Sequence, residues 1–168
     1  MSSSTVERAL AQITDVLGQV TPEDLERPTP CSEWTVADLS DHVVNSVAGM
    51  ATMASGGRPD FTNATHHDDP AAAVQREGQA LVNALGSSSG NFPEGMAAAE
   101  LAVHTYDLTT ALGRTTADLD PEIAETGLAF MSASMTDDNR GSAFGPPQPA
   151  PDDATAYQRI AAFAGRTV

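Results

Sequence analysis

The chain has a single cysteine, few aromatic residues and few basic residues. Cys31 has no second cysteine with which to form an intramolecular disulfide. Eight basic residues stand against 23 acidic ones, and the resulting formal net charge of −15 repels phosphate backbones and anionic membrane surfaces. No apolar run approaches the ~18 to 20 residues that a membrane-spanning helix needs. We therefore expect no nucleic-acid partner and no membrane association.

The N-terminal segment MSSSTVERAL has no apolar core flanked by basic residues, so the sequence predicts no signal peptide and a cytoplasmic location. Aromatic residues make up only 5% of the chain, and alanine is abundant, which favours helices over sheets. A chain of 168 residues is long enough to bury a core without disulfides or a metal. We expect one all-α domain covering residues 1–168.

Apolar residues recur at helical spacing in several segments, the first of which has Val6, Leu10, Ile13, Leu17 and Val20 on one face. The pattern predicts helices at 5–20, 35–50, 70–85, 93–113, 121–135 and, as a short terminal piece, 154–163. Polar residues with Gly and Pro predict a loop at 55–69. We expect an up-and-down four-helix bundle with one or two short additional C-terminal helices, and the patterns leave its crossover order open.

One segment, AAAELAVHTYDLTTALG, places three ionisable residues on an otherwise apolar helix. Glu100, His104 and Asp107 stand at positions i, i+4 and i+7, and therefore share one face. If this face points into a bundle, it offers a carboxylate and an imidazole to something buried. If it points to water, it is only a solvated face, and the spacing alone leaves both alternatives open.

A third candidate ligand lies on another predicted helix. His42 flanks the apolar stripe of the helix at 35–50, which places it half inward. Catalytic sites for zinc and similar ions use three protein ligands from His and carboxylate, with one position open. Glu100 and His104, one turn apart, can reach one ion together with His42 across the bundle. A Glu–His pair at this spacing also occurs as an ordinary surface interaction.

Three segments, RPTPCSEWTVADLSDHVVN, AELAVHTYDLTTALG and FGPPQPAPDDATAYQRIAAFAGR, resemble a known family. They are similar to the DinB-like metal-binding helical bundles related to the N-terminal domain of mycothiol-dependent maleylpyruvate isomerase. The resemblance implies that His42, Glu100 and His104 hold a divalent metal, usually Zn²⁺, with Ni²⁺, Fe²⁺ or Mn²⁺ as other choices. It also implies a low-molecular-weight thiol such as mycothiol as cosubstrate and a small electrophile as its reaction partner.

Five other residues have both a functional and a structural interpretation. Cys31 has no base or positive charge beside it in sequence, so we expect a packed structural thiol. Trp34 is expected to pack at the entrance of the helix that follows it. Tyr106 either lines a pocket or packs in the core. His66 and His67 lie in a polar loop, where we expect solvated side chains rather than an ion site.

The sequence leaves three functions open. The first is a metal-dependent enzyme of the thiol transferase or isomerase type, in which Asp107 holds a histidine tautomer or a water. For Asp107 itself, the alternative is an ordinary acid on the helix surface. The second function is a metal-binding or ligand-binding bundle without catalysis, and the third is a structural bundle whose His and Glu residues form a buried hydrogen-bonded cluster. A homodimer is also left open.

Overall fold

The computed structural model describes residues 4–31, 33–62, 64–87, 92–140 and 144–168. The secondary-structure elements among these residues are all helices. In chain order they are α1 (Thr5–Leu17), η1 (Pro22–Asp24), α2 (Val36–Ala54), α3 (Pro70–Ser87), α4 (Glu94–Ala111), α5 (Pro121–Ser134), η2 (Asp137–Asn139) and α6 (Ala156–Phe163). The predicted all-α fold with a short additional C-terminal helix is confirmed.

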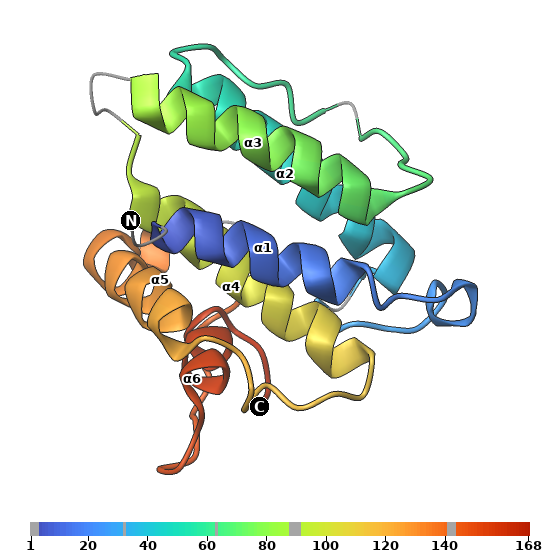
Figure 1. Ribbon diagram of the computed structural model, residues 1–168. Helices are drawn as coiled ribbons and strands as arrows, with labels where there is room; N and C mark the ends of the chain where they lie inside the picture. The colour runs from blue at the N-terminus through green and yellow to red at the C-terminus, as the bar shows by residue number, and fades with distance from the viewer. Residues whose placement is uncertain (1–3, 32, 63, 88–91, 141–143) are drawn as a thin grey trace.

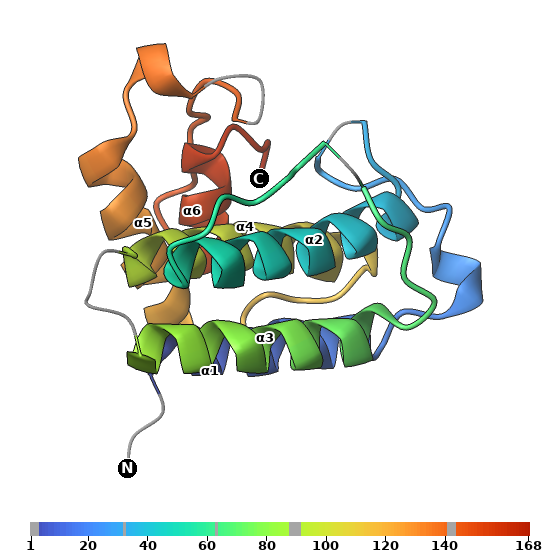
Figure 2. The same ribbon diagram turned by 90° about the horizontal axis from the view of Figure 1, so that it is seen from above.

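The first four α-helices form the bundle, and its order is the part that the sequence patterns leave open. Both α1 and α2 pack against α3 and α4, so that α1 and α2 lie diagonally opposite each other. Helices α1 and α4 run in one direction, and α2 and α3 run together in the other (Figure 1, Figure 2). The expected up-and-down alternation therefore does not hold between α2 and α3, because the connection 55–69 runs back along the bundle before α3 begins.

Helix α4 lies at the centre of the molecule. Helices α1 and α2 cover it within the bundle, and α5 and α6 pack against it as an additional layer. Small residues allow this close approach, since Ala97, Ala98 and Ala102 are fully buried on α4 and a Cβ added to Gly127 of α5 would lie 2.7 Å from the Cα of Ala99. A helix that is covered on all sides can carry polar residues only where they find partners.

Local capping accounts for the helix boundaries. Thr35 caps α2, because its side chain accepts a hydrogen bond from the backbone N–H of Asp38 while the Asp38 carboxylate accepts one from the backbone N–H of Thr35. The predicted start of this helix is therefore confirmed. Helix α1 ends at Leu17 rather than at residue 20, because Gly18 follows as its C-cap and glycine is a poor helix former. Within the described part of the chain, no helix is long and apolar enough to cross a bilayer.

Candidate metal centre

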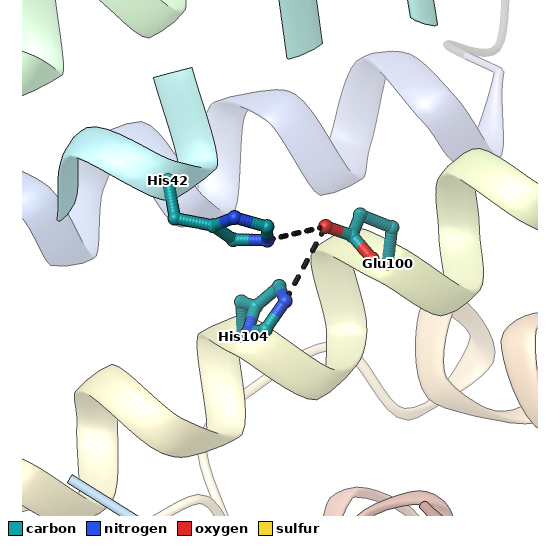
Figure 3. Close-up of side chains that lie close together, drawn as sticks. All are labelled: His42, Glu100 and His104. Carbon is teal, nitrogen blue, oxygen red and sulfur yellow. Dashed lines mark hydrogen bonds and ion pairs between the residues drawn. The ribbon is translucent and has the colours of Figure 1, made fainter. Parts of the chain in front are cut away.

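Three side chains from two helices meet between α2 and α4 (Figure 3). His42 comes from α2, and Glu100 and His104 come from α4, one turn apart. The Nε2 atom of His42 lies 3.0 Å from Oε1 of Glu100, and the Nε2 atom of His104 lies 3.3 Å from the same oxygen. One candidate ligand atom from each residue lies within 4.8 Å of the other two. The three residues that the sequence predicts as ligands therefore lie together.

A fourth residue of the cluster is missed by the sequence argument. Ser46 follows His42 by one turn of α2, and its hydroxyl donates a hydrogen bond of 2.6 Å to Oε1 of Glu100. The sequence signal was the i, i+4 spacing from His42, which places Ser46 on the same helix face. Burial alone raises the pKa of Glu100, but the charge of His104 and the hydrogen bonds from His104 and His42 outweigh burial and hold its pKa well below the usual value. Glu100 is therefore a carboxylate at neutral pH.

Behind His104 lies a buried ion pair. The Nδ1 atom of His104 lies 3.1 Å from Oδ2 of Asp107, and Arg166 donates from Nε and Nη2 to the two oxygens of the same carboxylate at 3.1 and 2.8 Å. The Asp107 side chain is 0% exposed and that of Arg166 is 5% exposed, so the alternative of a surface acid is wrong for Asp107. Sequence reasoning misses Arg166, because it lies 59 residues away from Asp107 in the chain.

This arrangement sets the charge of the histidine. Burial alone lowers the pKa of His104, but the negative charge of Glu100 and the hydrogen bonds to Asp107 and Glu100 outweigh it and raise that pKa to about 9. Burial likewise tends to raise the pKa of Asp107, whereas its hydrogen bonds with His104 and Arg166 lower it overall. In the metal-free protein the His104 imidazole is therefore protonated at neutral pH.

The donor set fits a divalent metal. In a tetrahedral site with bonds of ~2.0 to 2.1 Å, neighbouring ligand atoms are about 3.3 Å apart. The contacts of 3.0 and 3.3 Å that join the two Nε2 atoms to Glu100 are close to that spacing. With a proton on Nδ1 directed at Asp107, the neutral His104 ring presents the lone pair of Nε2 to the cluster, which is the usual support for a ligating histidine. Two imidazoles and a carboxylate suit Zn²⁺ and similar ions.

The cluster lies beside a large cavity. His42 and Glu100 belong to the lining of a cavity of about 770 Å³, within the range of small-molecule sites. Trp34 also lines this cavity, and its ring centroid lies 4.3 Å from that of His42 and 6.2 Å from that of His104. We expected Trp34 only to pack at the helix entrance, and the structure shows that its ring also covers the two histidines.

Comparison with known proteins identifies the family. A sequence profile of the mycothiol maleylpyruvate isomerase N-terminal domain matches residues 6–163. The chain belongs to this family. Two proteins of Mycobacterium tuberculosis, one from strain CDC 1551 / Oshkosh and one from strain ATCC 25618 / H37Rv, are each 34% identical to it over 177 aligned residues. The alignments cover 96% of the chain and 96% of each relative, and both relatives are named as uncharacterized proteins. No solved structure gives a significant match.

In this member of the mycothiol maleylpyruvate isomerase N-terminal domain family, the remaining candidate residues lie outside the cluster. Cys31 is a half-buried free thiol, and burial raises its pKa, which disfavours the thiolate. Tyr106 is 5% exposed and packs in the core. His66 is exposed and its Nδ1 atom pairs with Asp41 at 2.8 Å, while the backbone N–H of His67 donates to the same carboxylate. The two loop histidines thus fasten the connection 55–69 to α2.

Proposed function

We propose that this protein is a metal-dependent enzyme that transfers a low-molecular-weight thiol of the mycothiol type to a small electrophile. The observation that carries the proposal is the convergence of His42, Glu100 and His104 beside a cavity large enough for two small substrates. Family membership supports it, because the family is named after a mycothiol-dependent isomerase domain. Zn²⁺ is the metal we propose, and the reducing cytoplasm is the proposed location because thiols persist there.

In this proposal three residues of the cluster are ligands of the ion, and two further residues hold those ligands in place. His42 and His104 would offer their Nε2 atoms, that of His104 after loss of its proton, and Glu100 would offer a carboxylate oxygen that Ser46 holds in place by its hydrogen bond. Asp107 fixes the ring of His104 by accepting from Nδ1. When bound, a divalent ion stabilises a thiol as its thiolate, since a neighbouring cation lowers the thiol pKa from its ordinary value of ~8.5.

The proposed reaction is a nucleophilic substitution at carbon. A bond forms between the thiol sulfur and the electrophilic carbon, the bond from that carbon to its leaving group breaks, and the leaving group takes the electron pair. In an epoxide this group stays attached to the product as an alkoxide and takes up a proton. The thiol proton is released to solvent. The protein contributes orientation of both substrates in the cavity and exclusion of water by the apolar cavity wall.

The test is metal-dependent loss of free thiol. We expect protein loaded with Zn²⁺ to accelerate the loss of mycothiol with chlorodinitrobenzene or styrene oxide, and we expect a chelator or the substitution His104→Ala to remove the acceleration. His67→Ala is the matched control, since it removes a histidine that lies outside the cluster. Metal binding without thiol loss across a wider panel of electrophiles contradicts the proposed enzyme and favours a binding protein.

A metal-free structural cluster is the second candidate, and one observation favours it. Glu100 already has three partners on Oε1, from His42, His104 and Ser46, so its charge is satisfied without an ion. In that case the three residues stabilise the contact between α2 and α4 and bind no metal. The metal content of the purified protein separates this candidate from the proposed enzyme.

A further inference from the structure

The wall of the cavity beside the metal cluster is rich in large apolar side chains. They come from α2, α4, α5, the connection 55–69 and the segment after α5: Met50, Met53, Phe61, Met96, Phe130, Met131, Met135 and Phe144. Phenylalanine offers a flat apolar ring to a ligand. Methionine fits irregular apolar ligands, because its side chain has flexible dihedral angles and a polarizable sulfur. The wall therefore favours an apolar ligand of adaptable shape.

Apart from His42 and Glu100 of the metal cluster, the ionisable side chains of the lining are three carboxylates and one histidine. Asp38, Asp41 and Asp60 lie in the lining, and His66 is paired with Asp41. The N-terminus of α2 faces the same region, but the Asp38 carboxylate already accepts the backbone N–H of Thr35 there. This helix end is therefore already neutralised by a carboxylate and does not attract an anionic ligand.

No arginine occurs among the described residues that line the cavity, and the sequence contains no lysine. Arg140 and Arg166 are buried and bonded elsewhere, to the carbonyl oxygens of Gly145 and Phe163 and to Asp107. Arg58 and Arg114 are exposed outside the lining. The other arginines pair with carboxylates away from the cavity. Recognition of a carboxylate or a phosphate normally uses an arginine or a lysine side chain. The described residues of the lining include neither.

The mouth of the cavity carries an exposed aromatic ring. Phe61, in the connection 55–69, is 62% exposed although it belongs to the cavity lining. Its ring lies against Gly49 of α2, where an added Cβ would come within 2.5 Å of Phe61 Cε1. The absence of a side chain at Gly49 thus lets the ring lie at the opening. The ring therefore adds exposed apolar surface to the lining, which an apolar ligand would bury.

From these observations we infer that the cavity takes an uncharged, largely apolar small molecule as the electrophile and discriminates against carboxylate-bearing ones. That the ligand is an electrophile rests on the proposed function, whereas the preference for an uncharged ligand rests only on the cavity. Maleylpyruvate, which the family name mentions, carries carboxylates and is therefore not the ligand that this cavity favours.

A matched pair of fluorescent dyes tests the preference. N-phenylnaphthylamine is uncharged, and anilinonaphthalene sulfonate has the same rings with one added negative charge. Trp34 is the single tryptophan and lines the cavity, so energy transfer from it reports binding at this place. We expect the uncharged dye to bind about 20- to 30-fold more tightly, because each of three carboxylates, at an assumed separation of about 7 Å from the sulfonate, weakens its binding about threefold in a water-like medium. Both dyes are measured on the full chain freed of metal by a chelator, because Zn²⁺ at the cluster would add a cation beside Glu100 that the lining side chains do not supply.

Substitutions locate the preference on the cavity wall. Asp60→Asn is expected to improve binding of the sulfonate dye about threefold and to leave the uncharged dye unchanged, because asparagine keeps an oxygen that accepts from the backbone N–H of Thr62. Asp118→Asn is the matched control, because it removes the same charge from an exposed position outside the lining. Phe61→Ala is expected to weaken binding of the uncharged dye about threefold. Because Phe61 is exposed, we expect this substitution to leave the fold intact. Thermal unfolding of each variant is recorded as a check of folding.

The outcomes separate this inference from the proposed function. Equal or tighter binding of the sulfonate dye overturns the inference, even if the protein proves to be a thiol transferase. An equal response of the sulfonate dye to Asp118→Asn and Asp60→Asn also overturns it, since the effect would then be one of total charge. Preference for the uncharged dye in a protein that consumes no thiol supports the cavity assignment and contradicts only the proposed enzyme.

Discussion

The buried pair of Asp107 and Arg166 gives the sharpest prediction about how the site is supported. Asp107→Asn keeps the shape of the side chain but leaves the Arg166 guanidinium, 5% exposed, without its carboxylate. Removing one partner of a buried ion pair costs about 3 to 5 kcal/mol in the free energy of unfolding. In a domain of this size, each kcal/mol shifts the melting temperature by roughly 2 to 4 °C. We therefore expect the melting temperature to fall by about 10 °C.

The same substitution weakens the support of His104. Loss of the carboxylate that accepts from a ligating imidazole typically lowers metal affinity by about 10- to 100-fold. Calorimetry gives the melting temperature, and competition with a chromogenic zinc chelator gives the affinity. Glu122→Gln is the matched control, because its ion pair with Arg8 is exposed and is worth at most about 1 kcal/mol. If Asp107→Asn and Glu122→Gln have equal effects on both quantities, the supporting role of Asp107 is refuted.

Three further predictions concern the cluster and the packing around α4. Ser46→Ala removes the hydrogen bond to the Glu100 carboxylate and is expected to cost about 1.5 to 3 kcal/mol, measured as the free energy of unfolding in urea. Because the pKa of His104 is about 9 in the metal-free protein, zinc binding near pH 7.5 must displace its proton, so affinity should rise up to about tenfold per pH unit until pH 9. Titration calorimetry in buffers of different ionisation enthalpy measures that proton, and release of none would contradict the protonated state. Gly127→Ala places a Cβ 2.7 Å from the backbone of α4 and is expected to destabilise by at least about 1 to 3 kcal/mol, whereas Gly86→Ala, with open space around it, should be neutral or stabilising.

The raised pKa of His104 also makes the stability of the metal-free protein depend on pH. A histidine whose pKa is raised on folding stabilises the folded state fully below its unfolded pKa, near 6.5. This contribution is lost as the pH rises through about 9, where the folded protein also releases the proton. We expect the metal-free protein to lose stability between these two pH values, and a constant free energy of unfolding across this window would contradict the raised pKa.

Local patterns in the sequence predict the helices and part of the cluster. The apolar spacing and the Thr35 cap place the helices close to their observed bounds, because both features depend on contacts within a few residues. The i, i+4 spacing of Glu100 and His104 places them on one face for the same reason. Pairing them with His42 requires the resemblance to a family, since helix periodicity does not say which helices become neighbours.

The rest of the site depends on contacts between distant segments. Arg166 reaches Asp107 from the far end of the chain, and no local pattern indicates that contact. The parallel course of α2 and α3 depends on the path of the connection 55–69, whose polar composition predicts a loop but not its direction. The ring centroid of Trp34 lies 4.3 Å from that of His42 and 6.2 Å from that of His104, and the sequence position of Trp34 does not reveal these contacts.

The metal content of protein purified without a chelating tag tests directly whether His42, Glu100 and His104 hold an ion. We expect about one Zn²⁺ or similar ion per chain, held by three protein ligands, in the unaltered protein and in His67→Ala. A large loss of metal is expected in His42→Ala and in His104→Ala, with both variants still folded by circular dichroism. Equal metal content in all four proteins would show that the cluster of His42, Glu100 and His104 is not the metal site.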